Sequence, residues 1–162
     1  PRQMLDFMAT LHAFYCELLE TWARTDVDAL RIMDDWGSQR SLLIAPAMWR
    51  EYFQPMYRDY VQIAHAAGKK FFMHSDGHIL AIYPDLIEIG VDALNSQIFC
   101  MGVEKLAPFA DQITFWGEMD RQRLLAFATR LTAGGTLLPL LFGSVPERQG
   151  APPALPAAPL PA

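Results

Sequence analysis

The sequence predicts an α/β protein in which helices alternate with short buried strands of a parallel sheet. Apolar residues recur every three or four positions in long segments, which is helical spacing, and short apolar runs separate these segments. Each short run ends in polar residues or glycine, as Phe71–Met73 does at His74 and Asp76. Parallel strands need crossover connections, which are usually helical. The alternation therefore fits a doubly wound open sheet or part of an eight-stranded barrel.

The element boundaries follow from spacing and from residues that break regular structure. Ile44-Ala45-Pro46 opens the second helix, Pro55 should kink or divide it, and Gly68 should end it. Pro84 should interrupt the third helix early. The other expected helices cover Met4–Ala23, Ile79–Ile89, Val103–Phe109 and Arg121–Leu131. The expected strands are Ala29–Met33, Phe71–His74, Val91–Leu94 and Ile113–Trp116.

Composition excludes several classes of protein. The 162 residues, 52% of them hydrophobic, are enough for one domain with a sizeable core. A net charge of −5 argues against a nucleic-acid-binding surface. Cys16 and Cys100 are the only cysteines, which fits a reducing, cytoplasmic location. No apolar run approaches the ~20 residues that span a bilayer, and no signal peptide is evident, although the chain begins at Pro1 without a methionine.

Polar residues follow every predicted strand, and the carboxyl ends of parallel strands meet at one edge of the sheet. We therefore expect one pocket lined by Asp34, Asp35, Trp36, His74, Asp76, Asn95, Gln97, Glu118 and Asp120. Structural alternatives remain open for these residues: a solvated turn at Asp34 and Asp35, a helix cap at Asp76, and loop stabilisation at Asn95 and Gln97. No glycine-rich dinucleotide-binding fingerprint follows any strand, which disfavours a nucleotide-binding doubly wound sheet.

The ordered series of motifs resembles the C-terminal half of the uroporphyrinogen decarboxylase family, whose superfamily also contains cobalamin-dependent methyltransferases. The resemblance spans roughly residues 25 to 131. It is carried by Met33-Asp34-Asp35-Trp36-Gly37, Ala66-Ala67-Gly68-Lys69-Lys70, Phe72-Met73-His74-Ser75-Asp76-Gly77, Gly90-Val91-Asp92-Ala93-Leu94-Asn95 and Phe115-Trp116-Gly117-Glu118-Met119-Asp120.

The resemblance implies an eight-stranded (β/α)8 TIM barrel, of which residues 1–132 supply about four βα units with parallel strands and flanking helices. Residues 133–162 are rich first in Gly and Leu and then in Pro and Ala, and we expect this tail to be disordered or non-native. A half barrel leaves strand edges unpaired, so we expect either further upstream sequence or pairing with a second copy, as in a homodimer.

By the same resemblance, the chain is expected to belong to a decarboxylase, a lyase that removes carboxyl groups from a tetrapyrrole in porphyrin and haem biosynthesis. Such enzymes use no cofactor, and a carboxylate stabilises the protonated pyrrole as carbon dioxide leaves. The family's arginine-rich motif and key aspartate lie in its N-terminal part, so this fragment alone is expected to be inactive. No catalytic residue is assigned within it.

Two alternatives stay open. The methyltransferase branch uses zinc to activate a thiol, and its His-x-Cys motif matches His74-Ser75-Asp76, with Asp76 in place of the cysteine. A carboxylate can bind zinc beside histidine, but the lost thiolate weakens this assignment, so no metal is favoured. The other alternative is a non-catalytic truncated barrel. The expected partner is a small molecule, tetrapyrrole or corrinoid-related, with neither nucleic acid nor a membrane involved.

Overall fold

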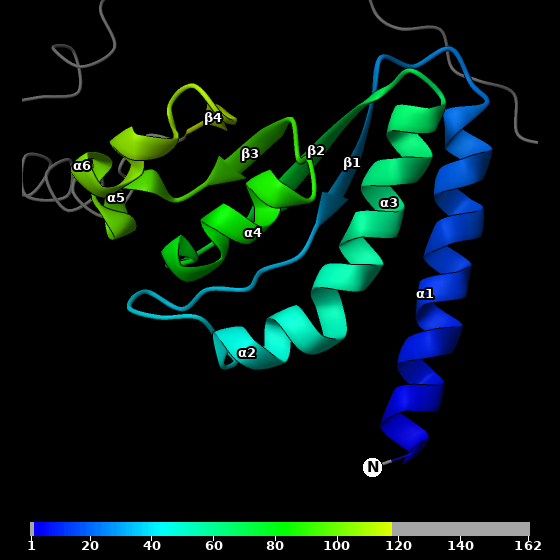
Figure 1. The fold of residues 1–162 in the computed structure, drawn as a ribbon, viewed down its shortest axis with the longest axis horizontal. Coiled ribbons are helices and arrows are strands. Elements are labelled where there is room, and N and C mark those ends of the chain that lie inside the picture. Colours follow the sequence, from blue (N-terminus) through cyan, green and yellow to red (C-terminus); the bar gives the residue numbers. More distant parts are fainter. Residues whose placement is uncertain (1, 118–162) are drawn as a thin grey trace, which may run out of the picture. The chain divides into compact units, whose positions relative to one another are not determined.

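A computed structural model of the chain describes residues 2–117 (Figure 1). The predicted helix over Arg121–Leu131, the predicted domain boundary after residue 132 and the Pro-rich tail lie outside these residues. The helices are α1 (Arg2–Ala23), α2 (Pro46–Met48), α3 (Gln54–Ala66), α4 (Tyr83–Glu88), α5 (Ile98–Met101) and α6 (Val103–Leu106). The strands are β1 (Ala29–Met33), β2 (Lys70–Ser75), β3 (Ala93–Ser96) and β4 (Thr114–Trp116).

The four strands form one parallel sheet in the order β1-β2-β3-β4. A doubly wound sheet reverses its strand order at a switch point, whereas a barrel adds each new strand beside the last one. The described strands show no such reversal. Helices α1 and α3 lie side by side and run opposite to β1 and β2, as expected for repeated βα units (Figure 1). The fold is therefore α/β with the strand order of a barrel.

The two faces of the sheet have different surroundings. Leu30 and Ile32 of β1 are buried in the core, whereas Arg31 and Met33, which alternate with them, are exposed. The alternation continues through β2, whereas three of the four residues of β3 are buried; the buried apolar side chains of both strands join helices α1, α3 and α4 in one core. We call the other side, which carries Arg31 and Met33, the exposed face. It corresponds to the interior of a complete barrel.

Side chains from the two outer strands meet over the exposed face. The guanidinium carbon of Arg31 in β1 lies 5.0 Å from the ring centre of Trp116 in β4. Between them, Phe72 of β2 contacts the Trp116 ring edge-on at 6.3 Å. Side chains of the two outer strands therefore meet across the exposed face.

The prolines divide helices as the sequence predicts, with one difference. A π-helical turn over Trp49–Phe53 separates α2 from α3, and Pro55 occupies the first turn of α3. Because proline has no N–H to donate, it interrupts the helical hydrogen bonds at this point. Pro84 lies in the first turn of α4 and opens that helix rather than interrupting it.

Several boundaries differ from the predicted ones: β2 is one residue longer at each end, β4 begins one residue later, and α4 is shorter than the predicted helix. Strand β3 begins at Ala93, two residues later than expected, and the Val91 N–H before it bonds back to the Leu86 carbonyl of α4. It also extends to Ser96, so that Asn95 is a strand residue and not a loop residue. Helix α5 was not predicted.

Candidate active site at the carboxyl ends of the strands

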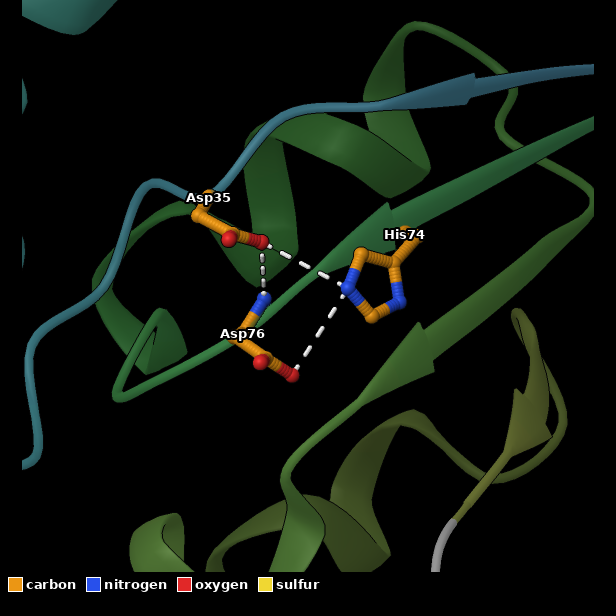
Figure 2. A group of neighbouring side chains, drawn as sticks. All are labelled: Asp35, His74 and Asp76. Atoms are coloured by element: carbon orange, nitrogen blue, oxygen red, sulfur yellow. Dashed lines mark hydrogen bonds and ion pairs between the residues drawn. The ribbon is translucent and has the colours of Figure 1, made fainter.

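Three of the predicted pocket residues gather at the carboxyl end of β2 (Figure 2). His74 belongs to β2, Asp76 follows that strand, and Asp35 follows the neighbouring strand β1. The Nε2 atom of His74 lies 3.4 Å from Oδ1 of Asp35 and 3.6 Å from Oδ1 of Asp76. The side chain of His74 is 18% exposed and that of Asp35 is 61% exposed. We call these three residues the Asp–His–Asp cluster.

Backbone contacts hold the two loops of the cluster together. The N–H of Asp76 donates to Oδ1 of Asp35 at 2.9 Å (Figure 2), and the N–H of Gly37 donates to the Asp76 carbonyl at 3.1 Å. Gly37 and Gly77 touch through their backbones: a Cβ on Gly77 would lie 2.2 Å from the Gly37 carbonyl group. Gly77 also has a φ of +81°, which favours glycine. Both glycines therefore allow Asp35 and Asp76 to approach each other.

The other side of His74 faces β3. Its Nδ1 atom lies 2.6 Å from Oδ1 of Asn95, and the Nδ2 group of Asn95 donates to the Trp116 carbonyl at 2.7 Å. Residues 33, 74, 95 and 116 are register partners across β1 to β4. The sheet itself therefore fixes the position of the histidine, and this interaction was not predicted from the sequence.

Asp34 and Trp36 do not join the cluster, which differs from the expectation of a shared pocket. The strand alternation continues past the end of β1, so residues 34 and 36 turn toward the helices and Asp35 turns to the exposed face. Tyr57 of α3 donates a hydrogen bond to Asp34, and the Trp36 indole donates to the Tyr57 hydroxyl at 2.9 Å. The Trp36 ring also packs on Phe53 at 4.5 Å.

Burial changes the acidity of the Asp34–Tyr57 pair. Burial raises the pKa of Asp34 above its usual value; the hydrogen bond from Tyr57 opposes this change, and the nearby Asp35 adds to it. Burial and the Asp34 carboxylate together hold the pKa of Tyr57 well above its usual value. Tyr57 therefore stays protonated at neutral pH and remains the hydrogen-bond donor.

The remaining predicted residues have other positions. Oε1 of Gln97 accepts the N–H of Gly77 at 3.2 Å, so this side chain braces the loop that carries Asp76. The helical segments after Asp76 have Ile79 and Ile82 at their N-cap positions, so Asp76 is not the capping residue there. Glu118 and Asp120 lie outside the described residues.

Sequence reasoning missed the contribution of Ser75, the middle residue of the His-x-Asp motif. Its side chain is fully buried, and its Oγ atom accepts the N–H of Trp36 at 3.0 Å. This bond ties the loop after β1 to the end of β2. A small hydroxyl residue between two functional polar residues was the only available signal, and it does not distinguish a structural bond from a catalytic group.

A hollow of about 730 Å³ lies away from the Asp–His–Asp cluster. His65 and Asp92 line it, together with Asp111. It is at the amino ends of the strands, where a parallel sheet does not normally place its ligand site. The Asp92 carboxylate there accepts hydrogen bonds from Lys70 at 2.8 Å, from the Phe71 N–H at 2.9 Å and pairs with His65 at 2.7 Å. We therefore assign Asp92 a structural role.

The Asp–His–Asp cluster has donors that fit a metal ion. Its three ligand atoms all lie within 4.8 Å of one another. A tetrahedral zinc ion with bonds of about 2.0–2.1 Å has ligand atoms roughly 3.3–3.4 Å apart. The distances from His74 Nε2 to the two carboxylates, 3.4 Å and 3.6 Å, are close to this spacing. The set of one imidazole and two carboxylates contains no thiolate.

Together, the fold and the Asp–His–Asp cluster define a class of protein, namely one with a parallel α/β sheet in barrel strand order and polar side chains at the carboxyl ends of its strands. Residues 1–133 match the family model described as Uroporphyrinogen decarboxylase (URO-D). The chain therefore belongs to the uroporphyrinogen decarboxylase family, and its sheet is part of that family's TIM barrel. Comparison with curated proteins and with solved structures gave no match. Among the described residues, no helix is both long and apolar enough to cross a bilayer.

Proposed function

We propose that this chain forms part of an enzyme that decarboxylates an acidic tetrapyrrole, without a metal or an organic cofactor. The Asp–His–Asp cluster carries the proposal, because it places two carboxylates and an imidazole on the exposed face at the carboxyl edge of the sheet. Carboxylates can accept the N–H groups of pyrrole rings and can stabilise a ring that gains positive charge. Membership of the family supports the same chemistry.

The reaction needs one proton for each carboxyl group that is removed. The ring is protonated first, the bond from the side-chain carbon to its carboxylate then breaks, and carbon dioxide leaves. The electron pair of that bond neutralises the cationic ring and leaves an exocyclic methylene carbon. This carbon then takes up a proton to become a methyl group while the ring loses the proton it had gained, so one proton is consumed overall. In this proposal Asp35 and Asp76 face the cationic ring, and Nε2 of His74 exchanges the proton.

The direct test is product analysis. The protein that contains this chain is incubated with uroporphyrinogen, and the products are oxidised and separated by carboxyl number. We expect products with fewer carboxyl groups, and a loss of rate of about 10²-fold in Asp35→Asn and in Asp76→Asn. Asp111→Asn, a change at an exposed aspartate outside the cluster, is the matched control and should leave the rate unchanged. Absence of any decarboxylated product from the unmodified protein rejects the proposal.

A second candidate, zinc-dependent methyl transfer linked to a corrinoid, is favoured by the spacing of the ligand atoms in the cluster. His74, Asp35 and Asp76 would hold the ion, and the ion would activate a thiol substrate. Metal analysis separates the two candidates. Zinc bound in a one-to-one ratio and lost in His74→Ala supports methyl transfer, whereas decarboxylation by a metal-free protein rejects it. A protein that shows neither reaction and only self-associates would be a non-catalytic barrel fragment.

A further inference from the structure

We infer that Asn95 is a positioning residue that fixes which nitrogen of His74 carries its permanent proton, and so keeps Nε2 facing Asp35 and Asp76. The hydrogen bonds that carry this inference do not depend on the reaction. Its effect on catalysis rests on the proposed function, in which Nε2 of His74 exchanges a proton.

The orientation of the Asn95 amide follows from its second partner. The Trp116 carbonyl, 2.7 Å from Nδ2, can only accept a hydrogen bond, so the NH2 group of the amide must face it. The amide oxygen is then the atom that faces His74. An amide oxygen also can only accept, so the Nδ1 atom of His74, 2.6 Å away, must carry a hydrogen.

The sheet register builds this arrangement from strands β2, β3 and β4. Trp116 lies in β4, Asn95 in β3 and His74 in β2, and each is the register partner of the next. The row ends at the loop after β1, where Asp35 faces Nε2 of His74. Because main-chain pairing fixes three of the four positions, the orientation does not depend on a mobile side chain.

The two ring nitrogens of His74 therefore have different roles. Nδ1 keeps its hydrogen for Asn95, so a neutral His74 presents a lone pair at Nε2. That atom lies 3.4 Å and 3.6 Å from the carboxylate oxygens of Asp35 and Asp76. Nε2 is therefore the ring nitrogen that faces the two carboxylates, and Nδ1 is the one held by Asn95. Isolated histidine in water favours the other neutral form, with its hydrogen on Nε2.

The test is nitrogen NMR of the full chain, labelled at its histidine rings and kept metal-free with a chelator. The spectra are recorded near pH 8.5, about two units above the usual pKa of free histidine. The chain has four histidines, and the signals of His74 are assigned as those lost in His74→Gln. We expect His74 of the unmodified chain to carry its hydrogen on Nδ1.

Two substitutions at Asn95 separate positioning from general packing. Asn95→Leu keeps the size but removes the acceptor, so His74 should shift toward the Nε2–H form. Asn95→Asp keeps an acceptor and should retain the Nδ1–H form. Gln112→Leu, which removes an amide that donates to the nearby Pro108 carbonyl, is the control and should leave the spectrum of His74 unchanged. Thermal unfolding of each variant verifies that it is folded.

Enzyme kinetics provide a second measurement, independent of the NMR spectra. If the proposed decarboxylation is correct, Asn95→Leu should lower kcat by about 10- to 100-fold with little change in KM, as is typical when a residue that orients a functional histidine is lost. Asn95→Asp should recover part of that loss. A hydrogen on Nε2 with none on Nδ1 in the unmodified chain, or an unchanged tautomer in folded Asn95→Leu, would overturn the inference. Absence of decarboxylation together with the Nδ1–H form would overturn only the proposed function.

Discussion

At the scale of single residues, Asp34 and Asp35 are adjacent in the chain but have different surroundings. Asp34 accepts a hydrogen bond from Tyr57 on the helix side of the sheet, whereas Asp35 faces His74 on the exposed face. Two neighbouring aspartates would repel each other in one pocket, and the strand alternation separates them. Only Asp35 is therefore available to a ligand at the Asp–His–Asp cluster.

The Asp34–Tyr57 pair predicts a destabilising substitution. Tyr57→Phe leaves the Asp34 carboxylate without its donor and removes the acceptor of the Trp36 indole. We expect the free energy of unfolding at pH 7 to fall by about 1–3 kcal/mol. Urea denaturation measures this change. The matched control is Tyr52→Phe, whose hydroxyl interacts with the adjacent Glu51, and it should change stability by less than about 0.5 kcal/mol.

The pH dependence of this effect follows from the raised pKa of Asp34. Since its pKa is higher in the folded state than in the unfolded state, Asp34 favours folding most below its unfolded pKa of about 3.9. This contribution is lost as the pH rises through the folded-state value. Tyr57→Phe removes the hydrogen bond that lowers this pKa, so the cost of the substitution should be smaller at pH 3 than at pH 7. A cost independent of pH would contradict this assignment.

At the scale of elements, the loops after β1 and β2 depend on the backbone contact between Gly37 and Gly77. Gly77→Ala would place a methyl group 2.2 Å from the Gly37 carbonyl and strain a φ of +81°. We expect it to lower the free energy of unfolding by at least about 3 kcal/mol. Gly68→Ala has a similar φ of +69° but meets no atom within 4 Å, so it should cost only the backbone strain, about 1–2 kcal/mol. Equal costs would show that the contact is unimportant.

Asp92 ties helix α3 to strand β2 at the opposite end of the sheet. Burial alone would raise its pKa, but the bonds from Lys70, the Phe71 N–H and His65 together lower the pKa below its usual value. A lowered pKa gives stability that is present above the unfolded pKa, about 3.9, and is lost as the pH falls through the folded value. We therefore expect Asp92→Asn to cost about 1–3 kcal/mol at pH 7 and progressively less below pH 4.

The measurement for Asp92 is denaturant unfolding across this pH range. Asp26→Asn, a change at an exposed aspartate in the turn after α1, is the control and should leave stability nearly unchanged at every pH. A loss of stability in Asp92→Asn that persists at pH 3 would show that the residue acts through packing and not through its charge.

Much of the fold could be predicted at this scale, and particular residues show why the rest could not. The apolar spacing located α1, β1 and β4 because their periodicity is uninterrupted. Strand β3 was displaced because Asn95 and Ser96 are polar, and only tertiary pairing with β2 makes them strand residues. The short helix α5 was missed because four residues are too few to show a helical period.

At the scale of the whole molecule, each strand lies beside its neighbour in sequence, so β2 and β3 are paired on both sides while β1 has one described neighbour. Hydrogen exchange should reflect this order. We expect the slowest amide exchange in β2 and β3 and faster exchange in β1, measured by mass spectrometry of the intact chain. Exchange in β1 as slow as in β2 would contradict this and would indicate a further segment paired with its outer edge.

The position of the candidate site on the molecule could be predicted from the sequence, but the residues that belong to it could not all be predicted. Parallel strands carry functional groups at their carboxyl ends, which located Asp35, His74 and Asp76. Deciding that Asp34 and Trp36 turn the other way requires knowing where the strand alternation ends. The partner of His74 was equally hidden, because the bond to Asn95 depends on the register between β2 and β3.

Because side chains alternate between the two faces along β1, the number of residues in this strand determines which carboxylate reaches the candidate site. Removing one residue within β1 would move the later side chains of this strand and of its extended continuation to the opposite face of the sheet. Asp34 would then turn to the exposed face, and Asp35 would take its place near Tyr57. Both carboxylates would still be present in the sequence, yet neither would keep its partner. Strand exchange between members of this family should therefore preserve the number of residues between Leu30 and Gly37 before it preserves their identities.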